Sequence, residues 1–424
     1  MKMKLTEGQL KYLDWEYGMF FHFGIRSFYP GHVDWDGREM ALEGFDPDSL
    51  DCEDWIKTAK DAGATYAILT AKHHDGFALW PSKYSSYSVA YTPWKNGSGD
   101  VVGEFVAACR KYGVKVGLYY SPAQWGEHAI KFENGREYDD YFINQISELL
   151  QNYGKIDYLW FDGCGSEGHE FDKKRIVDTI FALQPEILTF CDPEWTPCVR
   201  WVGNEDGYAD LDNPIVVDSW DFSEKSEEVV KLLHKYPLPA ECDCKLRSTW
   251  FYDNNEDTIK SVDELFGMYE GSVGRGSNFL INIGPDNHGL IDPRDKARIL
   301  ELAEKIKNVY GAPQEYGEIE RNGNCYTVSH QDMKKGFHDE LSVKVINRIE
   351  ITEDIEDGAA IRGFKVYVHL PHYKHKRILA YIGATVGHKL ICPIPAIRTP
   401  KITVEVTSAE GEHSIKSIRG YYVN

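Results

Sequence analysis

The sequence predicts an irregular (β/α)8 barrel over residues 1–310, followed by an antiparallel β-sandwich over residues 311–424. Three observations lead to this prediction. Short apolar segments alternate with amphipathic segments up to about residue 308, as in a parallel sheet covered by helices. Seven such apolar segments are visible, which favours a closed barrel over a doubly wound sheet, although the eighth strand stays unassigned. After Gly311 the pattern changes to short β-rich segments separated by turns.

The expected barrel strands are apolar runs in which apolar and polar residues mostly do not alternate. Such runs are typical of strands that are buried on both faces. In chain order they lie at 18–24, 65–74, 115–122, 157–163, 186–192, 214–220 and 278–285.

Between these runs lie segments with helical spacing of apolar residues. Residues 100–113 begin with Asp100 as an N-cap and end at Gly113, a residue type that often terminates helices. The same spacing predicts helices at 49–63, 141–154 and 262–274.

The last part of the chain reads as a separate β-rich unit. Residues 311–323 contain Gly, Pro and charged residues and form the expected linker. Beyond it, strand-like segments such as GFKVYVHL and KITVEVT are separated by charged or Gly/Pro turns. This pattern predicts an antiparallel sandwich of about 100 residues.

Composition and charge exclude several classes of partner. Among 424 residues, 42% are hydrophobic and 13% are aromatic, which is typical of a globular protein. The net charge of −20 argues against a nucleic-acid partner, because such binding depends on Lys and Arg at phosphates. We also expect no membrane span, because no stretch approaches 18 consecutive apolar residues.

The cysteines and the N-terminal segment bear on the compartment. The nine cysteines are scattered, odd in number and form no CxxC pair, which favours reduced thiols over a zinc site. The first residues contain no apolar core of a signal peptide. We therefore expect a cytoplasmic protein; a leader removed from a mature chain would instead fit a secreted one.

Polar side chains stand at the ends of the expected strands, where barrels carry their active sites. Asp162 ends the fourth run, in YLWFDGCG, and a turn-forming Asp-Gly pair alone would explain it. Polar residues at several successive strand ends are harder to explain by packing, because buried His and Asp are costly unless paired. These residues are His22, His73, His74, Tyr119, Tyr120, Asp192, Glu194 and Asn282.

Two classes of hydrolase could use such residues. In a metal-dependent hydrolase, histidines and carboxylates would be ligands. Neighbours in an extended strand point to opposite faces, so His73 and His74 share an ion only if the strand ends or bulges there. The chain has no HxH or HExxH motif, and we expect no metal ion. Glycoside hydrolysis needs two carboxylates, with aromatic residues such as Trp35, Trp80 and Trp160 on the sugar.

Five segments resemble, in order and spacing, the α-L-fucosidases of glycoside hydrolase family 29. They are GMFFHFGI, LTAKHHDGFALWPSKYSSYSV, GDVVGEFVAACRKYGVKVGLYYSP, IDYLWFDG and SVGRGSNFLINIGPDNHGLI, and the resemblance covers roughly residues 8–300. It implies retaining hydrolysis without a cofactor on an irregular barrel that is followed by a β-sandwich.

The resemblance also implies roles for residues. The Asp of the family's W-x-D motif matches Asp162, which would be the nucleophile, so the strand would end on Asp162 because the reaction takes place there. Tyr119 is favoured over Tyr120 as the tyrosine of the fucose pocket. The residues matching that pocket are His22, Asp34, Trp35, His73, His74, Tyr119 and Trp160.

The acid/base residue lies in a variable loop of the family, and Glu194, Glu205 and Glu241 are candidates. The stretch VRWVGNEDGYA resembles the R-W-x-G-N-E segment of fucosidases that act on branched α-1,3/1,4-linked fucose, which favours Glu205. A solvated loop glutamate beside Asp206 is the alternative. Glu241, in PAECD, would then be a substrate-pocket residue.

The expected function is therefore release of terminal α-1,3/1,4-linked L-fucose from Lewis-type glycans. The W-E-x-C motif of the broader-specificity fucosidases is absent, which supports this subgroup. Two alternatives stay open: a broad-specificity fucosidase acting on aryl or α-1,2/1,6-linked fucosides, and a non-catalytic carbohydrate-binding barrel. The expected partner is a fucosylated oligosaccharide or glycoconjugate.

Overall fold

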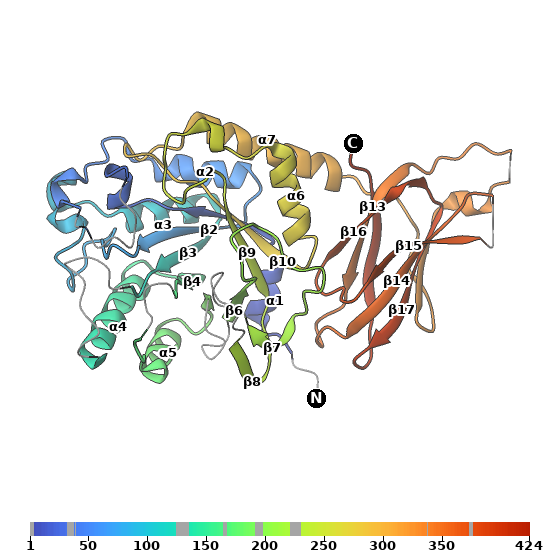
Figure 1. Cartoon of the computed structure of the whole chain (residues 1–424), viewed down its shortest axis with the longest axis horizontal. Coiled ribbons are helices and arrows are strands. Elements are labelled where there is room, and N and C mark those ends of the chain that lie inside the picture. Colours follow the sequence, from blue (N-terminus) through green and yellow to red (C-terminus); the bar gives the residue numbers. More distant parts are fainter. Residues whose placement is uncertain are drawn as a thin grey trace.

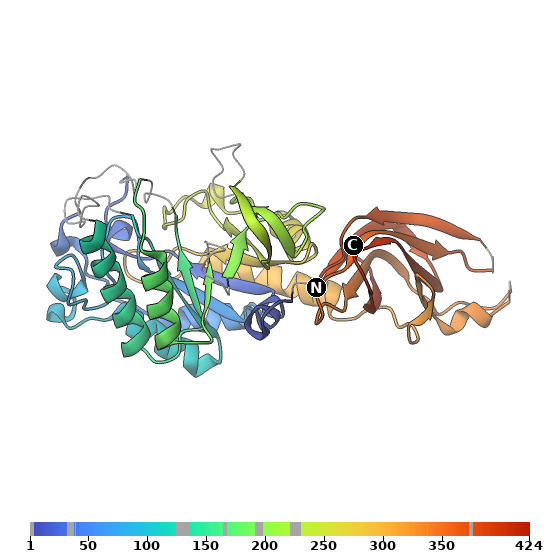
Figure 2. The same ribbon diagram turned by 90° about the horizontal axis from the view of Figure 1, so that it is seen from below.

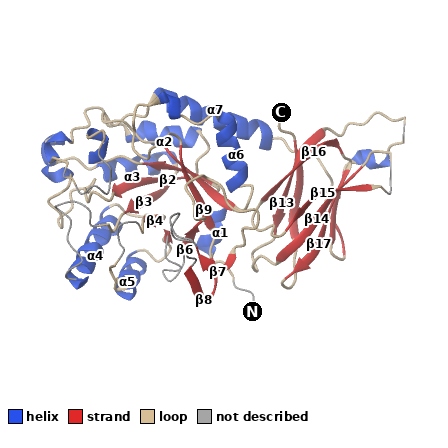
Figure 3. Ribbon diagram, in the orientation of Figure 1, coloured by secondary structure: helices blue, strands red, loops and turns tan. Residues whose placement is uncertain are grey.

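The chain forms a barrel and a β-sandwich that lie side by side (Figures 1 and 2). The computed structural model describes residues 4–31, 38, 40–123, 135–163, 168–190, 198–220, 230–336, 338–372 and 376–424. Figure 3 shows helices around the barrel strands and only strands and loops in most of the second part. The predicted fold class is confirmed.

The barrel is closed by eight parallel strands in the order β1-β10-β9-β6-β5-β4-β3-β2. In chain order these strands are β1 (Tyr17–Phe21), β2 (Tyr66–Lys72), β3 (Lys115–Tyr120), β4 (Tyr158–Phe161), β5 (Leu188–Phe190), β6 (Cys198–Trp201), β9 (Ala240–Lys245) and β10 (Ser277–Asn282).

One predicted barrel strand is wrong, and two were missed. Segment 214–220 contains β7 (Val216–Trp220), but this strand pairs antiparallel with β8 (Val230–Pro237), outside the barrel. The two missed strands are β6 and β9. Strand β9 reads AECDCK, and its charged residues lie at every second position, where Glu241, Asp243 and Lys245 contact Trp160, Trp201 and Glu205. It therefore lacks the apolar run by which the correctly predicted barrel strands were found.

Helix α3 begins and ends where its capping residues predict, whereas α4 begins at Gly135 and not at 141 as predicted. The side chain of Asp100 accepts a hydrogen bond from the Gly103 amide at the start of α3, and Gly113 follows the helix in a left-handed conformation. The helices are α1 (Glu7–Leu13), α2 (Cys52–Asp61), α3 (Val101–Tyr112), α4 (Gly135–Asn152), α5 (Lys173–Leu183), α6 (Val262–Ser272) and α7 (Pro293–Tyr310). Short 3₁₀ turns lie at Ile25–Phe28, Leu42–Gly44, Val89–Tyr91, Trp94–Gly97, Glu256–Thr258 and Gln331–Lys334.

Aromatic side chains fill the barrel interior. At its amino end Tyr66 lies against Gly18, where an added Cβ would be 2.3 Å from the phenol ring. Only glycine therefore fits beside this ring. Helix α1 reaches the same region, because Tyr12 contacts the rings of Tyr66 and Tyr158. A separate, larger core lies between the strands and the surrounding helices.

The second part consists of two antiparallel sheets around its own apolar core. One sheet has the order β11-β12-β17-β14-β15 and the other β16-β13-β18. Arg348 connects this part to α6, with its Nε 2.8 Å from Glu270 Oε1. The strands are β11 (Glu320–Asn322), β12 (Cys325–Ser329), β13 (Val345–Glu353), β14 (Ile361–His369), β15 (Arg377–Gly383), β16 (Leu390–Arg398), β17 (Lys401–Ala409) and β18 (Ile415–Tyr421).

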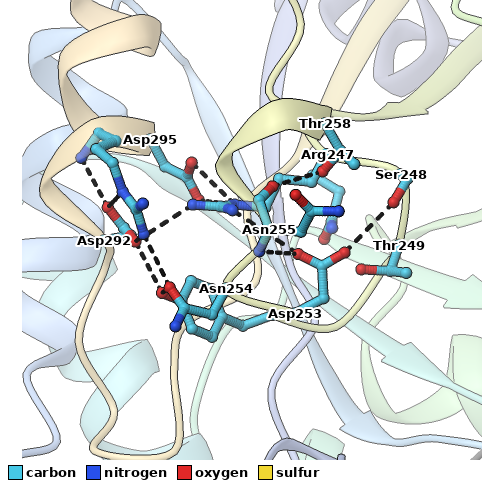
Figure 4. A network of polar contacts seen from close by, with 12 residues as sticks. Arg247, Ser248, Thr249, Asp253, Asn254, Asn255, Thr258, Asp292 and Asp295 are labelled. Carbon is cyan, nitrogen blue, oxygen red and sulfur yellow. Dashed lines mark hydrogen bonds and ion pairs between the residues drawn. The ribbon is translucent and has the colours of Figure 1, made fainter. Parts of the chain in front are cut away.

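A buried ion network anchors the loop that follows β9 (Figure 4). Arg247 Nε lies 3.0 and 2.9 Å from the two oxygens of Asp295, and its Nη2 lies 3.2 Å from Asp292 Oδ2. Hydrogen bonds from Arg294 hold the pKa of Asp292 well below its usual range. Burial raises the pKa of Asp295. This network joins the loop after β9 to the start of α7. It therefore fixes the position of the loop relative to the helix.

Replacing Arg247 with Met should destabilise the chain by about 3–5 kcal/mol, because the buried Asp295 would lose its cation and Asp292 would keep only Arg294. Urea unfolding measures this loss. The control is Lys57→Met, which removes an exposed partner of Asp61 and should cost less than about 1 kcal/mol. Equal losses for the two variants would contradict the role of the network.

Candidate active site

Asp162 lies directly after β4, at the carboxyl end of the barrel. Its side chain is 24% exposed, and its Oδ2 accepts a hydrogen bond of 2.8 Å from the Tyr119 hydroxyl. His74 Nε2 lies 3.5 Å from the same oxygen. The structure thus places an accessible carboxylate between two side chains that orient it.

His73 and His74 both face this carboxylate region although they are neighbours in sequence. Strand β2 ends at Lys72, and its pairing with β3 shifts between Thr70 and Lys72. The alternation of an extended strand therefore no longer applies, and the two imidazole centroids lie 4.3 Å apart. His73 stacks on Tyr119 at 5.4 Å.

The surroundings of His22 and His73 favour neutral imidazoles. Burial lowers the pKa of His22 to about 3, and burial lowers the pKa of His73 well below its usual range. His22 Nδ1 lies 2.7 Å from Asn282 Oδ1, and the amide nitrogen of Asn282 donates to the carbonyl of Trp250. This arrangement assigns the proton of His22 to Nδ1 and makes Nε2 an acceptor. A neutral imidazole has one donor and one acceptor nitrogen, so it can form hydrogen bonds with the hydroxyl groups of a ligand.

An aromatic row supports Asp162 from below. Tyr119, Trp160 and Phe190 are cross-strand neighbours on β3, β4 and β5. The Trp160 ring stacks on Phe190 at 4.0 Å and on Tyr119 at 5.3 Å. Because Tyr119 donates to Asp162, the position of this row determines where the carboxylate lies.

Trp250 and Phe251 complete the group of residues around Asp162, His22 and His73 at the carboxyl end of the barrel, which is called the opening below. Sequence reasoning missed both residues. Trp250 stacks on His22 at 4.7 Å, and Phe251 meets His22 and His73 edge-on. They lie in the loop after β9, where the aromatic run WFY is the only sequence signal. The suggested sugar contact of Trp80 is wrong, because Trp80 is buried and donates to Glu148.

Glu205 follows β6 and joins the same opening through Lys245. Its Oε2 lies 2.6 Å from Lys245 Nζ, and its side chain is 34% exposed. The ammonium group of Lys245 also lies 4.9 Å from the centre of the Trp250 ring. Burial raises the pKa of Asp243, two residues before Lys245, well above its usual range, and the nearby Glu205 carboxylate acts in the same direction.

The structure places Glu241 beneath the opening instead of in its wall. Its side chain has no exposed surface. Among the described residues, four groups donate to its oxygens, and one of them is the indole nitrogen of Trp160 at 2.8 Å. With both oxygens occupied by protein groups, Glu241 has no direct route to a bound sugar.

Four residues singled out from the sequence, namely Asp34, Trp35, Asp192 and Glu194, lie outside the described residues. Over the described part of the chain, no three His, Cys, Asp or Glu side chains come together to hold a metal ion. No helix within the described ranges has both the length and the apolar character needed to cross a bilayer.

The sequence pattern of the family described as Alpha-L-fucosidase matches residues 3–311. The chain is also 37% identical to Alpha-L-fucosidase 1 of Arabidopsis thaliana over 308 residues. This match covers 70% of the chain but only 59% of the length of the plant protein.

Two solved structures share the fold over nearly the whole chain. A glycoside hydrolase 29 family member from an unknown rumen bacterium has 29% identity and a TM-score of 0.85, covering 99% of this chain and 77% of that one. A GH29 fucosidase of Ruminococcus gnavus in complex with fucose has 25% identity and a TM-score of 0.82, covering 100% and 95%. Together with the match over residues 3–311, these similarities show that the chain belongs to the α-L-fucosidase family, glycoside hydrolase family 29.

Proposed function

We propose that this protein is a retaining α-L-fucosidase that releases terminal α-1,3/1,4-linked L-fucose from branched, Lewis-type glycans. The observation that carries the proposal is the Asp162 carboxylate at the barrel mouth, oriented by Tyr119 and His74. The neutral imidazoles and the aromatic rings around it suit an uncharged sugar. The Ruminococcus gnavus relative, solved in complex with fucose, supports the same class of substrate.

In the first step, an oxygen of Asp162 attacks the anomeric carbon while the bond from that carbon to the leaving oxygen breaks. Glu205 gives its proton to the leaving oxygen, so the aglycone departs as an alcohol. In the second step, Glu205 takes a proton from water, which attacks the anomeric carbon and releases Asp162. Two inversions at one carbon retain the α configuration.

The assignment of Glu205 rests on the VRWVGNE segment and on its contact with Lys245. Glu205 must be protonated before the first step and ionised before the second. The ammonium group of Lys245, whose Nζ lies 2.6 Å from Glu205 Oε2, holds the side chain of Glu205 in place. In a retaining enzyme the carboxyl groups of Asp162 and Glu205 would lie about 5–5.5 Å apart during reaction.

The linkage preference follows from the same segment. A broad-specificity fucosidase is the alternative, in which another residue would be the acid/base.

An apolar wall against the C6 methyl group would separate fucose from galactose, which carries a hydroxymethyl group there. Trp250 and Phe251 are the aromatic residues available for such a wall in the described part of the opening.

Asp162→Ala should lower kcat on the order of 10⁴-fold or more, because the fucosyl-enzyme can no longer form. Added azide should then occupy the vacated position and give β-L-fucosyl azide, the inverted product. The free energy of unfolding should stay within about 1 kcal/mol of wild type. The exposed Asp178→Ala is the control and should keep full activity. Near wild-type turnover by Asp162→Ala would refute the nucleophile assignment.

Glu205→Ala should lose far more activity on a glycan than on an aryl fucoside with an acidic leaving group, because such a group departs without a proton. The fucosyl-enzyme still forms in this variant, so azide should give α-L-fucosyl azide with retained configuration. Product analysis by NMR distinguishes the two azides. Equal losses on both substrates would contradict the acid/base assignment.

A Lewis-type branched trisaccharide should release fucose faster than an α-1,2-fucosylated lactose or an aryl α-L-fucoside. The measurement is kcat/KM for each substrate under identical conditions. Preference for the aryl substrate would keep the fucosidase and overturn both the linkage and the choice of Glu205. No release from any of the three would favour a carbohydrate-binding barrel.

A further inference from the structure

Glu241 places a carboxyl group in the middle of the barrel interior. Its Oε2 accepts hydrogen bonds from Tyr12 (2.8 Å) and Tyr66 (2.7 Å), and its Oε1 accepts them from Tyr158 (3.2 Å) and Trp160 (2.8 Å). Two donors at each oxygen are the pattern that an ionised carboxylate accepts. The side chain is completely buried.

Packing alone does not require this residue. Barrel interiors are commonly filled by branched apolar side chains, and a buried carboxylate costs free energy unless each oxygen is well hydrogen-bonded. Within the described chain, Glu241 has no ion pair to Lys, Arg or His. Burial accordingly raises the pKa of Glu241. The roles of its four hydrogen-bond partners therefore have to explain why the chain buries a carboxylate here.

One of the four partners connects Glu241 to the site. The Trp160 ring, held by its indole nitrogen, lies between Tyr119 and Phe190 in the row across β3, β4 and β5. A rotation of the indole would move the Tyr119 ring that stacks on it. The Tyr119 hydroxyl would then leave its 2.8 Å contact with Asp162.

We propose that Glu241 is a positioning residue for the nucleophile: it fixes the indole of Trp160, which through Tyr119 holds Asp162 in its reactive orientation. This inference rests on the proposed role of Asp162. Glu241 itself touches neither sugar nor reacting atoms.

The other partners provide a matched control. Tyr66 donates to the same carboxylate at a similar distance, but its ring contacts those of Tyr12, Trp15 and Tyr158 at the amino end of the barrel. Tyr66→Phe therefore removes one hydrogen bond from Glu241 without disturbing the row above it. A merely structural role of Glu241 would give Tyr66→Phe and Glu241→Gln the same effect on activity.

Glu241→Gln should lower kcat about 10- to 100-fold, the loss expected when a reacting group is displaced by about 1 Å. KM should change little, because the sugar contacts remain. Tyr66→Phe should keep kcat within about twofold while lowering stability to urea. The rate of fucosyl-enzyme formation in a single turnover with an aryl fucoside should fall in Glu241→Gln alone. Similar kcat values for the two variants would overturn the proposal.

Two further measurements keep the test independent of folding and of the proposed function. The indole N–H resonance of Trp160 in ¹⁵N NMR should shift in Glu241→Gln and stay in place in Tyr66→Phe. If Glu241→Gln does not fold, Trp160→Phe keeps a stacked ring without the N–H, and wild-type kcat in this variant would refute the relay. Turnover by Asp162→Ala would refute the proposed function, whereas an inactive Asp162→Ala with a fully active Glu241→Gln would refute only the role of Glu241.

Discussion

The row of rings formed by Tyr119, Trp160 and Phe190 is the constraint on which the barrel mouth depends. Parallel pairing of β3, β4 and β5 brings these residues into one line, and stacking leaves the middle ring little freedom. Above the row lies Asp162, and below it the carboxylate of Glu241. The opening is thus built on the packed interior, and its geometry follows from the same contacts that stabilise the fold.

Most of the barrel could be predicted from the sequence because its strands are buried on both faces and its helices carry clear caps. The capped helix that starts after Asp100 is an example of such a local signal. Strand β9 could not be found this way, because its inward side chains are charged and meet partners that lie far away in the sequence. Segment 214–220 is apolar enough for a barrel strand, but only tertiary contacts decide that it pairs with β8.

The residues of the site also divide into those that the sequence predicts and those that only tertiary contacts reveal. Residues at strand ends, such as His22 and Asp162, could be identified because strand polarity brings carboxyl ends together and because the family motifs mark them. The family itself is confirmed over residues 3–311. Trp250 and Phe251 could not be identified, since a loop held by Arg247 brings them to His22. Nor does a strand pattern reveal that Glu241 lies one layer below the opening.

The contact between Gly18 and Tyr66 constrains how this barrel can evolve. The two residues share one volume, since even a methyl group on Gly18 would overlap the phenol ring. A larger residue at position 18 is therefore tolerated only after Tyr66 has become smaller, and that change removes a donor from Glu241. Tyr66 must therefore change before Gly18. The protein that carries only the first change lacks the hydrogen bond from Tyr66 to Glu241. Homologous barrels should accordingly carry a larger residue at position 18 only where position 66 holds a residue smaller than Tyr.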